Sequence, residues 1–405
     1  MTRLNRGRPE LWKSKFMNNT QTFITFLLII LSTSCMAQDD VLIKTYGGNG
    51  SDRGIHIIQA SDSNFVVVGN TTVEGKNLDV YLLKCNSSGD TLWTRKFGGP
   101  EDDNGWSIKE TSDRGYIITG FTESYGAGKN DVLLMKTDVN GVEQWSKTFG
   151  GSGDDIGWSI AINDDGGFTI AAQTDGYGNG ELDAYLIRAD ANGDTLWTRT
   201  FGGPKTDRVF SVALADDGSA LLAGITYSYG AGDRDAWLLK TGSSGDLLWQ
   251  KTYGGPGYDN AHGVIVNSEN EIILTGYGDY WGNEEKRNIF LKKITMDGED
   301  VWTQKYGGPE NDRAMTVFQT QDNGYVMTGF TQSFGQGAWD AYVLRTDAAG
   351  DTLWTSTYGA TAPDFGYDVI QSVQGDYFVT GWSHSFGQPE GGLLLIKIID
   401  VTRQF

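Results

Sequence analysis

The sequence predicts an all-β fold, a seven-bladed β-propeller with four strands in each blade. A unit of about 52 residues recurs along the chain, each unit holds four short apolar runs separated by turn residues, and the two ends of the chain carry complementary parts of one blade. The composition agrees, because 56 glycines, 7 prolines and 12% aromatic residues in 405 are typical of a turn-rich β-protein.

The repeat is marked by an aromatic residue followed by two glycines, with alanine in place of the second glycine in the last copy. The copies lie 51, 52, 52, 52, 53 and 52 residues apart, a regularity that indicates a repeat architecture. The aromatic residues are Tyr46, Phe97, Phe149, Phe201, Tyr253, Tyr306 and Tyr358.

The four strands expected in each unit are clearest in the second unit, at residues 105–109, 116–120, 132–136 and 143–149. The second and third runs are nearly continuous in apolar residues, which is typical of strands buried on both faces. Stacked propeller blades bury both faces of their sheets.

The two ends of the chain predict how the ring closes. The first unit begins with a single fourth-type strand at 41–46, and the chain ends shortly after a third-type strand at 393–398. If residues 41–46 complete the last blade, the ring has seven four-stranded blades and no open sheet edge.

Residues 1–37 are expected to be a signal peptide and residues 38–405 the propeller. The apolar run Phe23–Leu31 is too short for a bilayer, which needs about 20 helical residues, but it follows basic residues and precedes small ones. The start residue stays open between Met1 and Met17. The type of cleavage stays open as well: Cys35 is the lipid-modified cysteine of a lipoprotein, or residues 35–37 form an ordinary cleavage site. Both predict an exported protein, either an outer-membrane or cell-surface lipoprotein or a secreted or periplasmic one.

The net charge of −20 argues against nucleic acids and anionic membrane surfaces as partners, because both require clustered Lys and Arg. Membrane contact is therefore expected only through a lipid on Cys35, and the protein is expected to be a monomer. Cys85 has no cysteine partner in the propeller and is interpreted as a small buried apolar residue. No cofactor is predicted, and calcium is left open.

The units resemble those of exported bacterial and archaeal propeller-repeat proteins, whose pattern YGG…DGGY…GxT…GD-LW-K-YGG is followed here by elements such as Gly193-Asp-Thr-Leu-Trp197. The resemblance covers residues 41–399. It implies the propeller fold and an extracytoplasmic location, and it implies almost nothing about activity.

Two recurring residue types are given structural interpretations. The tryptophans are expected to pack between adjacent blades; they are Trp93, Trp145, Trp197, Trp249, Trp302 and Trp354. One aspartate per unit is expected to cap loop N–H groups instead of binding calcium; these are Asp52, Asp103, Asp155, Asp207, Asp259, Asp312 and Asp364. A second acid at the start of the third strand is interpreted in the same way, at Asp79, Asp131, Asp183, Asp235 and Asp340, with Asn288 in the fifth unit.

The predicted ligand-binding residues are aromatic side chains that precede glycine in the loop between the second and third strands. These loop aromatics are Tyr125, Tyr177, Tyr229, Trp281, Phe334 and Phe386. If the strands run outward in chain order, this loop and the Gly-Gly loop lie on one face of the disk, where flat rings beside carboxylates suit neutral sugars. Shielding of the blade edge is the competing interpretation.

Departures from the repeat are few. The fifth unit is the least regular, with His262 and an unusual loop at 280–287, and Arg53, Arg208 and Arg313 follow the recurring aspartate in three units only. Separately, each is interpreted as an ordinary surface residue.

The chain has no catalytic motif such as Gly-x-Ser-x-Gly or His-Glu-x-x-His, so no catalytic residue is assigned. The sequence favours a non-enzymatic binding or scaffold module for a protein or glycan partner at the cell envelope. The alternative is a hydrolase or lyase that acts on a polysaccharide.

Overall fold

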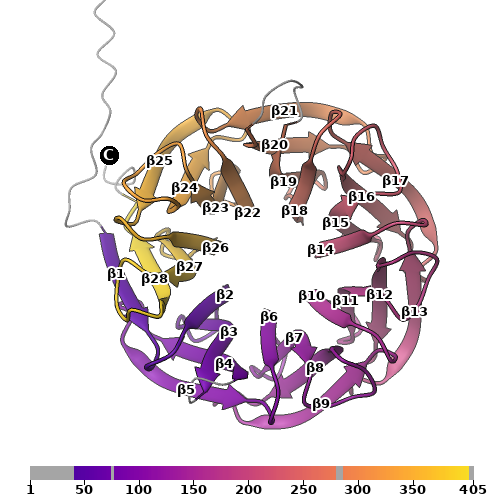
Figure 1. Cartoon of the computed structure of the whole chain (residues 1–405), viewed down its shortest axis with the longest axis horizontal. Coiled ribbons are helices and arrows are strands. Elements are labelled where there is room, and N and C mark those ends of the chain that lie inside the picture. The colour runs from indigo at the N-terminus through magenta and orange to yellow at the C-terminus, as the bar shows by residue number, and fades with distance from the viewer. Residues whose placement is uncertain (1–40, 74–76, 280–285, 401–405) are drawn as a thin grey trace, which may run out of the picture. The chain divides into compact units, whose positions relative to one another are not determined.

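The computed structural model of the chain confirms the seven-bladed propeller. It describes residues 41–73, 77–279 and 286–400, and in these residues 28 strands form seven four-stranded antiparallel sheets around a central axis (Figure 1). Within these ranges there is no helix of the length and apolar character that crossing a bilayer requires. The predicted signal peptide, Cys35 and Trp281 lie outside the described residues.

Each blade places its strands in chain order from the axis outward (Figure 1). The innermost strands are β2 (Asp52–Gln59), β6 (Asp103–Glu110), β10 (Asp155–Ile162), β14 (Asp207–Leu214), β18 (Asp259–Val266), β22 (Asp312–Gln319) and β26 (Asp364–Gln371). The second strands are β3 (Phe65–Val73), β7 (Tyr116–Thr122), β11 (Phe168–Thr174), β15 (Ala220–Thr226), β19 (Ile272–Gly278), β23 (Tyr325–Thr331) and β27 (Tyr377–Ser383). The third strands are β4 (Asn77–Cys85), β8 (Asp131–Thr137), β12 (Asp183–Ala189), β16 (Asp235–Thr241), β20 (Asn288–Ile294), β24 (Asp340–Thr346) and β28 (Gly392–Ile398). The outermost strands are β5 (Thr91–Phe97), β9 (Glu143–Phe149), β13 (Thr195–Phe201), β17 (Leu247–Tyr253), β21 (Asp300–Tyr306), β25 (Thr352–Tyr358) and β1 (Val41–Tyr46).

The ring closes as predicted, because the first strand of the chain completes the last blade. Strand β1 pairs antiparallel with β28, with Val41 opposite Ile398 and Tyr46 opposite Leu393. The sheet order β1-β28-β27-β26 therefore joins the two ends of the propeller through main-chain hydrogen bonds. The outer edge of this blade is thereby covered like those of the other six blades.

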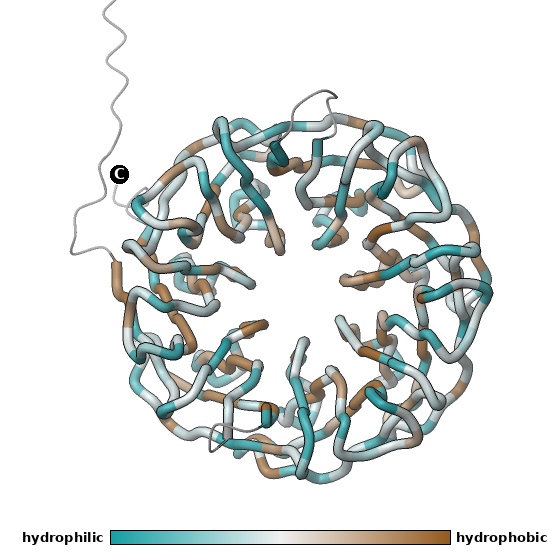
Figure 2. Tube along the Cα trace, in the orientation of Figure 1, coloured by the Kyte–Doolittle hydropathy of each residue, from teal (hydrophilic) through white to brown (hydrophobic). Residues whose placement is uncertain are grey.

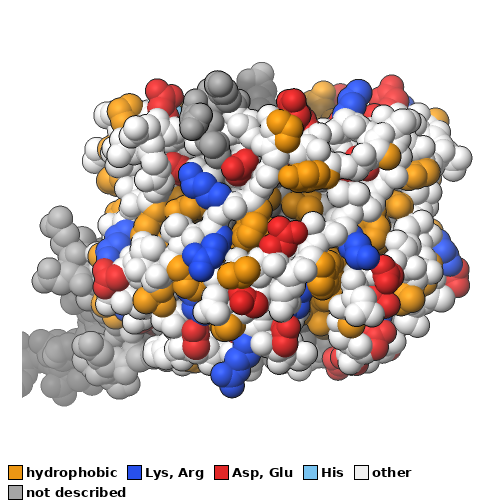
Figure 3. Space-filling view, turned by 90° about the horizontal axis from the view of Figure 1, so that it is seen from below, with side chains coloured by type: hydrophobic (Ala, Val, Ile, Leu, Met, Phe, Trp, Pro, Cys, Tyr) orange, Lys and Arg blue, Asp and Glu red, His pale blue; other side chains and the backbone are white. Residues whose placement is uncertain are grey.

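The hydrophobic core lies between the blades. Strands β8 and β12 are buried along their whole length, whereas the outermost strands β9 and β13 consist mostly of exposed and half-buried residues. Hydrophobic stretches recur in every blade, and charged side chains of both signs lie among apolar ones on the rim (Figures 2 and 3). Cys85 is fully buried in β4, and burial raises the pKa of its thiol to about 11, which confirms its interpretation as an apolar filler.

The recurring tryptophans pack against the next blade, as predicted. The ring centroid of Trp93 lies 6.2 Å from that of Tyr116, and the centroids of Trp354 and Tyr377 are 5.5 Å apart. Trp249 donates a hydrogen bond from Nε1 to the carbonyl oxygen of Met296, at 3.3 Å. Each contact crosses a blade boundary, so these rings stabilise the packing of neighbouring sheets.

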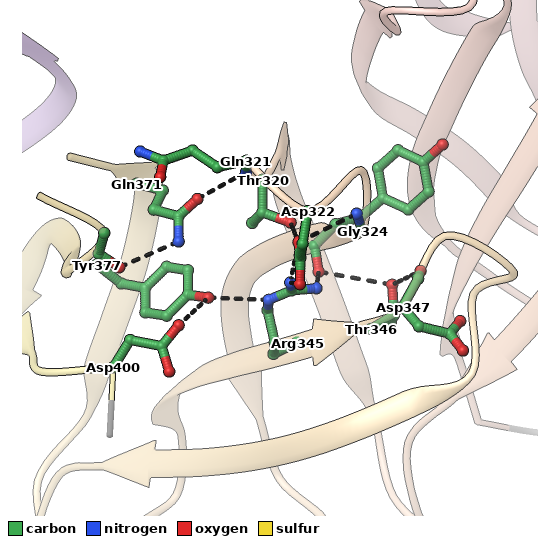
Figure 4. A network of polar contacts seen from close by, with 12 residues as sticks. Thr320, Gln321, Asp322, Gly324, Arg345, Thr346, Asp347, Gln371, Tyr377 and Asp400 are labelled. Atoms are coloured by element: carbon green, nitrogen blue, oxygen red, sulfur yellow. Dashed lines mark hydrogen bonds and ion pairs between the residues drawn. The ribbon is translucent and has the colours of Figure 1, made fainter. Parts of the chain in front are cut away.

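A buried or half-buried cation on the third strand links each blade to the turn between its first two strands. In the sixth blade, Arg345 pairs with Asp322 of that turn, and its Nε donates a hydrogen bond to the Tyr377 hydroxyl of the seventh blade at 2.9 Å (Figure 4). The equivalent pairs are Lys84–Asp62, Lys136–Asp113, Arg188–Asp165, Lys240–Asp217, Lys293–Glu269 and Lys397–Asp376. Burial of the cation is tolerated because the carboxylate and nearby oxygen acceptors replace its hydration.

Replacement of Gly193 by alanine should destabilise the propeller more than the same change at Gly166. Both glycines have left-handed backbones, with φ of +81° and +80°. A Cβ at Gly193 would lie 2.6 Å from Trp145, whereas the nearest atom to a Cβ at Gly166 is 3.9 Å away, in Ala191. Both variants lose about 1–2 kcal/mol from backbone strain, and Gly193→Ala should lose about 1–3 kcal/mol more from overpacking. Urea unfolding measures the difference, and equal losses would contradict the proposed packing of Trp145 against this turn.

Candidate functional site

The recurring aspartate of each innermost strand caps the Gly-Gly loop, as predicted. Asp207 is fully buried, and its Oδ2 accepts hydrogen bonds from the Gly203 N–H at 2.7 Å and the Ser228 hydroxyl at 2.6 Å. The same N–H contact occurs in every blade, to Asp52, Asp103, Asp155, Asp207, Asp259, Asp312 and Asp364. Among the described residues, His, Cys, Asp and Glu side chains nowhere gather in a group of three or more that could hold a metal ion.

The second recurring acid holds the loop that carries the loop aromatics. Asp183 accepts hydrogen bonds from the N–H groups of Asn179 and Gly180, at 2.7 and 3.0 Å. The hydroxyl of Tyr177 in the same loop donates to the carbonyl oxygen of Gly150, at 3.0 Å. Because Gly150 belongs to a Gly-Gly loop, this bond confirms that the two kinds of loop lie on one face of the disk. Equivalent bonds join Tyr125 to Gly98 and Tyr229 to Gly202.

The loop aromatics differ in how much of each ring is open to solvent. The exposed fractions are 58% for Tyr125, 47% for Tyr177, 37% for Tyr229 and 41% for Phe334. Phe386 is half-buried. Three of the rings also pack on a buried aromatic side chain of the third strand, in the pairs Tyr177–Tyr185, Tyr229–Trp237 and Phe334–Tyr342. Each ring therefore rests on its blade on one side, and ligand binding by its open side stays a prediction.

An axial channel of about 1090 Å³ runs between the innermost strands, and the sequence analysis did not identify it as a site. Each of these strands contains a register shift that leaves one residue without a cross-strand partner. A bulge of this kind turns a side chain out of the normal alternation. The seven bulge residues all line the channel, and we call them the bulge ring: Ile55, Trp106, Trp158, Phe210, His262, Met315 and Tyr367.

The bulge ring is aromatic over four consecutive blades. The ring centroids of Trp106 and Trp158 are 4.6 Å apart, those of Trp158 and Phe210 are 5.4 Å apart, and Phe210 stacks on His262 at 4.7 Å. Burial, with the charges of Arg313 and Arg234, lowers the pKa of His262 to about 3, so this imidazole is neutral near pH 7. Four touching rings thus form a continuous wall that suits the flat face of a ligand.

The seventh, first and second blades also bring polar, titratable side chains to the channel. Asp368 of the seventh blade accepts a hydrogen bond from the Ile57 N–H at 2.9 Å, and His56 Nε2 lies 3.7 Å from the same carboxylate oxygen. Burial raises the pKa of Asp368 to about 6, although the positive charge of Lys109 on the second blade acts to lower this pKa. Burial lowers the pKa of Lys109, and burial with the charge of Lys109 lowers that of His56. Three adjacent blades therefore bring together an acid, a lysine and a histidine, and burial favours the neutral form of each.

The arginines that follow the recurring aspartate are not ordinary surface residues, which corrects the sequence interpretation. Arg53, Arg208 and Arg313 are half-buried on innermost strands. The Arg53 guanidinium lies 4.3 Å from the ring centroid of Trp382 in the neighbouring blade, and that of Arg313 lies 4.8 Å from the centroid of Tyr277. Tertiary packing, which the repeat pattern does not report, makes these positions half-buried.

One sequence signal does mark the bulge ring. The residue three places after each recurring aspartate is large in all seven units, whereas the residue two places after the aspartate is small. The small residues are Gly54, Gly105, Gly157, Val209, Ala261, Ala314 and Gly366. The bulge explains why the large residues face the axis, but alternation alone does not reveal a bulge.

The comparisons with other proteins define the fold and leave the family open. No protein-family model matches the chain. Regulatory protein FlaEY of Caulobacter vibrioides is 26% identical over 349 residues, which cover 78% of this chain and 34% of that protein. The chain thus spans about a third of the length of this curated relative.

Two solved structures share the propeller fold. The WD40 domain of Pan2 from Neurospora crassa superposes with a TM-score of 0.53 at 10% identity, over 90% of this chain and 98% of that domain. BBS1N, solved in complex with ARL6DN, has a TM-score of 0.51 at 9% identity, over 90% of this chain and 97% of that chain. At these identities the likeness shows the fold alone.

The stability of the propeller should depend on Asp368 between pH 4 and 6. The folded protein holds a proton on Asp368 up to about pH 6, whereas the unfolded chain releases it near the ordinary value of 3.8. The contribution of this group to stability is therefore fully present below pH 4 and falls as the pH rises through 6, by about 3 kcal/mol for a shift of this size.

Asp368→Asn should remove that fall, so its stability relative to wild type should increase from pH 4 to pH 7 in urea unfolding. The pKa values of His56 and Lys109 are lowered, so these groups act in the opposite direction in both proteins. A difference between the two proteins that does not change with pH would refute this assignment.

Proposed function

We propose that this chain is a non-enzymatic binding module of the cell envelope, which holds a protein or glycan partner on the face that carries the loop aromatics. One observation carries the proposal. Exposed aromatic rings are held in place on one face by hydrogen bonds at both ends of their loops, as in the loop of Tyr177 and Asp183. Rigid rings that are partly open to water contribute contact area at a low cost in conformational entropy.

The rest of the proposal has separate support. The expected signal peptide supports export to the envelope. The absence of a catalytic motif favours binding over catalysis, and the rigid, closed ring suits a scaffold. BBS1N, a propeller of the same fold, binds a protein in its solved complex, which supports a protein as one of the two partner classes.

A glycan array with residues 38–405, with and without calcium, tests the proposal. Binding is expected, and it should weaken at least about tenfold in a Tyr177→Ala/Tyr229→Ala variant, because each lost aromatic contact is worth about 1 kcal/mol or more. Tyr177→Phe/Tyr229→Phe keeps the rings and removes only the hydrogen bonds to Gly150 and Gly202, so it should retain binding.

Leu196→Ala is the matched control, because Leu196 is 56% exposed on the outermost strand β13, away from this face. Unchanged binding in the alanine double variant would refute the aromatic face as the site. If the folded protein binds no glycan, the proposal is restricted to a protein partner.

One observation favours a second candidate, a hydrolase or lyase acting on a polysaccharide. His56, Lys109 and Asp368 meet in a channel that also carries an aromatic wall, and a buried carboxyl with a raised pKa is suited to general acid catalysis. If this candidate is correct, the protein should release new chain ends from a polysaccharide, and Asp368→Asn should slow the release by about 100-fold or more. Wild-type protein that releases none above a buffer blank excludes it.

A further inference from the structure

Three successive rings of side chains line the axial channel, with one residue from each blade in each ring. The first is the bulge ring, and the residue after each bulge residue belongs to the second. The third ring, which we call the Lys109 ring, follows three places after the bulge ring: Ile58, Lys109, Ala161, Ala213, Ile265, Phe318 and Ile370. Because each innermost strand starts at a Gly-Gly loop, the Lys109 ring lies deeper in the channel than the bulge ring, as seen from that face. Lys109 thus places a charge in an otherwise apolar ring.

The ammonium group of Lys109 has no partner. Lys109 is half-buried and lines the channel, and its Nζ is open to solvent. It forms neither an ion pair nor a hydrogen bond with any residue in the described ranges. Another enclosed cation shows the contrasting case, because Lys136 Nζ lies 2.8 Å from the Asp113 carboxylate. Burial lowers the pKa of Lys109, although the charge of Asp368 acts to raise it, so the fold itself does not compensate this charge fully.

The charges of the channel favour a ligand with a single negative charge. The lining contains two cations, Arg53 and Lys109, and two carboxylates, Glu110 and Asp368. Both carboxylates already accept hydrogen bonds from main-chain N–H groups, at 2.7 Å for Glu110 and 2.9 Å for Asp368. Neither cation forms an ion pair within the described part of the chain. One carboxylate therefore finds an unpaired cation, whereas a polyanion is repelled by a protein of net charge −20.

The aromatic wall can hold the uncharged part of such a ligand. Trp106, Trp158 and Phe210 are half-buried and line the channel, so part of each ring is open to it. Trp158 is fixed by a hydrogen bond from its Nε1 to the side-chain oxygen of Gln173, at 3.0 Å. Flat, fixed rings pack well against the face of an aromatic ligand.

The spacing of the two features limits the size of the ligand. Trp106 and Lys109 both lie on β6, and three residues of a strand span about 10 Å. The lysine side chain extends over part of this distance. One or two fused rings with a carboxylate attached directly or through a short chain are therefore long enough to contact both residues.

A sugar is less well matched to this channel, because few hydrogen-bond acceptors remain for its hydroxyl groups. Ser159 Oγ accepts the Val212 N–H at 3.3 Å, and Ser211 Oγ accepts the Val264 N–H at 3.2 Å. These bonds join neighbouring innermost strands, and Asp368 is used in the same way. The second ring thus spends its acceptors on contacts between blades, and a ligand with one anionic group demands fewer of them.

We infer that the axial channel binds a small aromatic carboxylate, whose ring lies against Trp106 and Trp158 and whose carboxylate pairs with Lys109. The charge-assisted hydrogen bond from the lysine fixes the orientation of the ligand, and the wall supplies apolar contact. The loop aromatics do not line this channel, so the inference goes beyond the proposed function and does not rest on it.

Isothermal titration of residues 38–405 with 2-naphthoate and two analogues tests the inference. 2-Naphthamide has the same rings without the charge, and decahydronaphthalene-2-carboxylate has the charge without flat rings. 2-Naphthoate should bind about tenfold or more tightly than the amide, a difference of about 1.4 kcal/mol. It should bind about threefold or more tightly than the saturated acid, because aromatic pairs contribute beyond the area that they bury.

Two variants assign the contacts. Lys109→Met keeps an unbranched side chain and removes the charge, so it should weaken 2-naphthoate about tenfold or more and leave 2-naphthamide unchanged. Trp106→Leu should weaken both probes. Lys96→Met is the matched control, because Lys96 is exposed on the outermost strand β5, and it should change neither affinity.

The melting temperature separates a loss of binding from a loss of folding. That of unliganded Lys109→Met should equal or exceed the wild-type value, since the change removes an enclosed charge without an ion-pair partner. Tyr177→Ala/Tyr229→Ala should bind 2-naphthoate with unchanged affinity, because these rings lie outside the channel.

Four results would overturn the inference. They are no binding of 2-naphthoate, equal binding of 2-naphthoate and 2-naphthamide, full affinity in Lys109→Met, and loss of 2-naphthoate binding in the Tyr177→Ala/Tyr229→Ala variant. The last result would place the probe on the loop aromatics. A loss of glycan or protein binding in that variant, with 2-naphthoate still bound, concerns the proposed function alone and leaves the channel site intact.

Discussion

The capped Gly-Gly loop is the connection on which every blade depends, because it carries the chain from the rim back to the axis. In the loop before the fourth blade, Asp207 accepts the Gly203 N–H, and a Cβ on Gly202 would lie 1.8 Å from a carboxylate oxygen of Asp183. The first glycine therefore passes between a carboxylate of the preceding blade and one of the blade that follows. Burial, with the charge of Asp207, raises the pKa of Asp183, and the loop N–H groups offset the cost of holding two carboxylates close together. This arrangement explains why the first glycine of the pair recurs in every unit.

The bulge in each innermost strand separates the part of the repeat that must be constant from the part that varies. The strands pair on both sides of the bulge in the same way in each of these blades, so the bulge residue changes from Trp106 to His262 to Met315 without disturbing the sheet. Structural symmetry thus surrounds a chemically asymmetric channel, with an aromatic wall on the second to fifth blades and Asp368, His56 and Lys109 on the seventh, first and second. A ligand without sevenfold symmetry requires such differences.

Sequence reasoning succeeded where one physical requirement is repeated in every unit. The blade number, the closing strand 41–46 and the packing of tryptophans such as Trp145 follow from recurrence, because each blade meets its neighbour in the same way. The two kinds of loop could also be placed on one face, once the strands were assumed to run outward. The exposure of individual rings was not accessible, because Tyr125 and Phe386 look alike in the sequence and differ only in their surroundings.

The sequence by itself determined the architecture of this protein, since the period of the repeat, the buried strands and the complementary ends have only one compact arrangement. The tertiary structure alone decided which residues meet at the axis. His56, Lys109 and Asp368 lie in different units of the repeat and line one channel. Their proximity arises from closure of the ring and from a one-residue bulge, and a local pattern carries no information about distances across a ring.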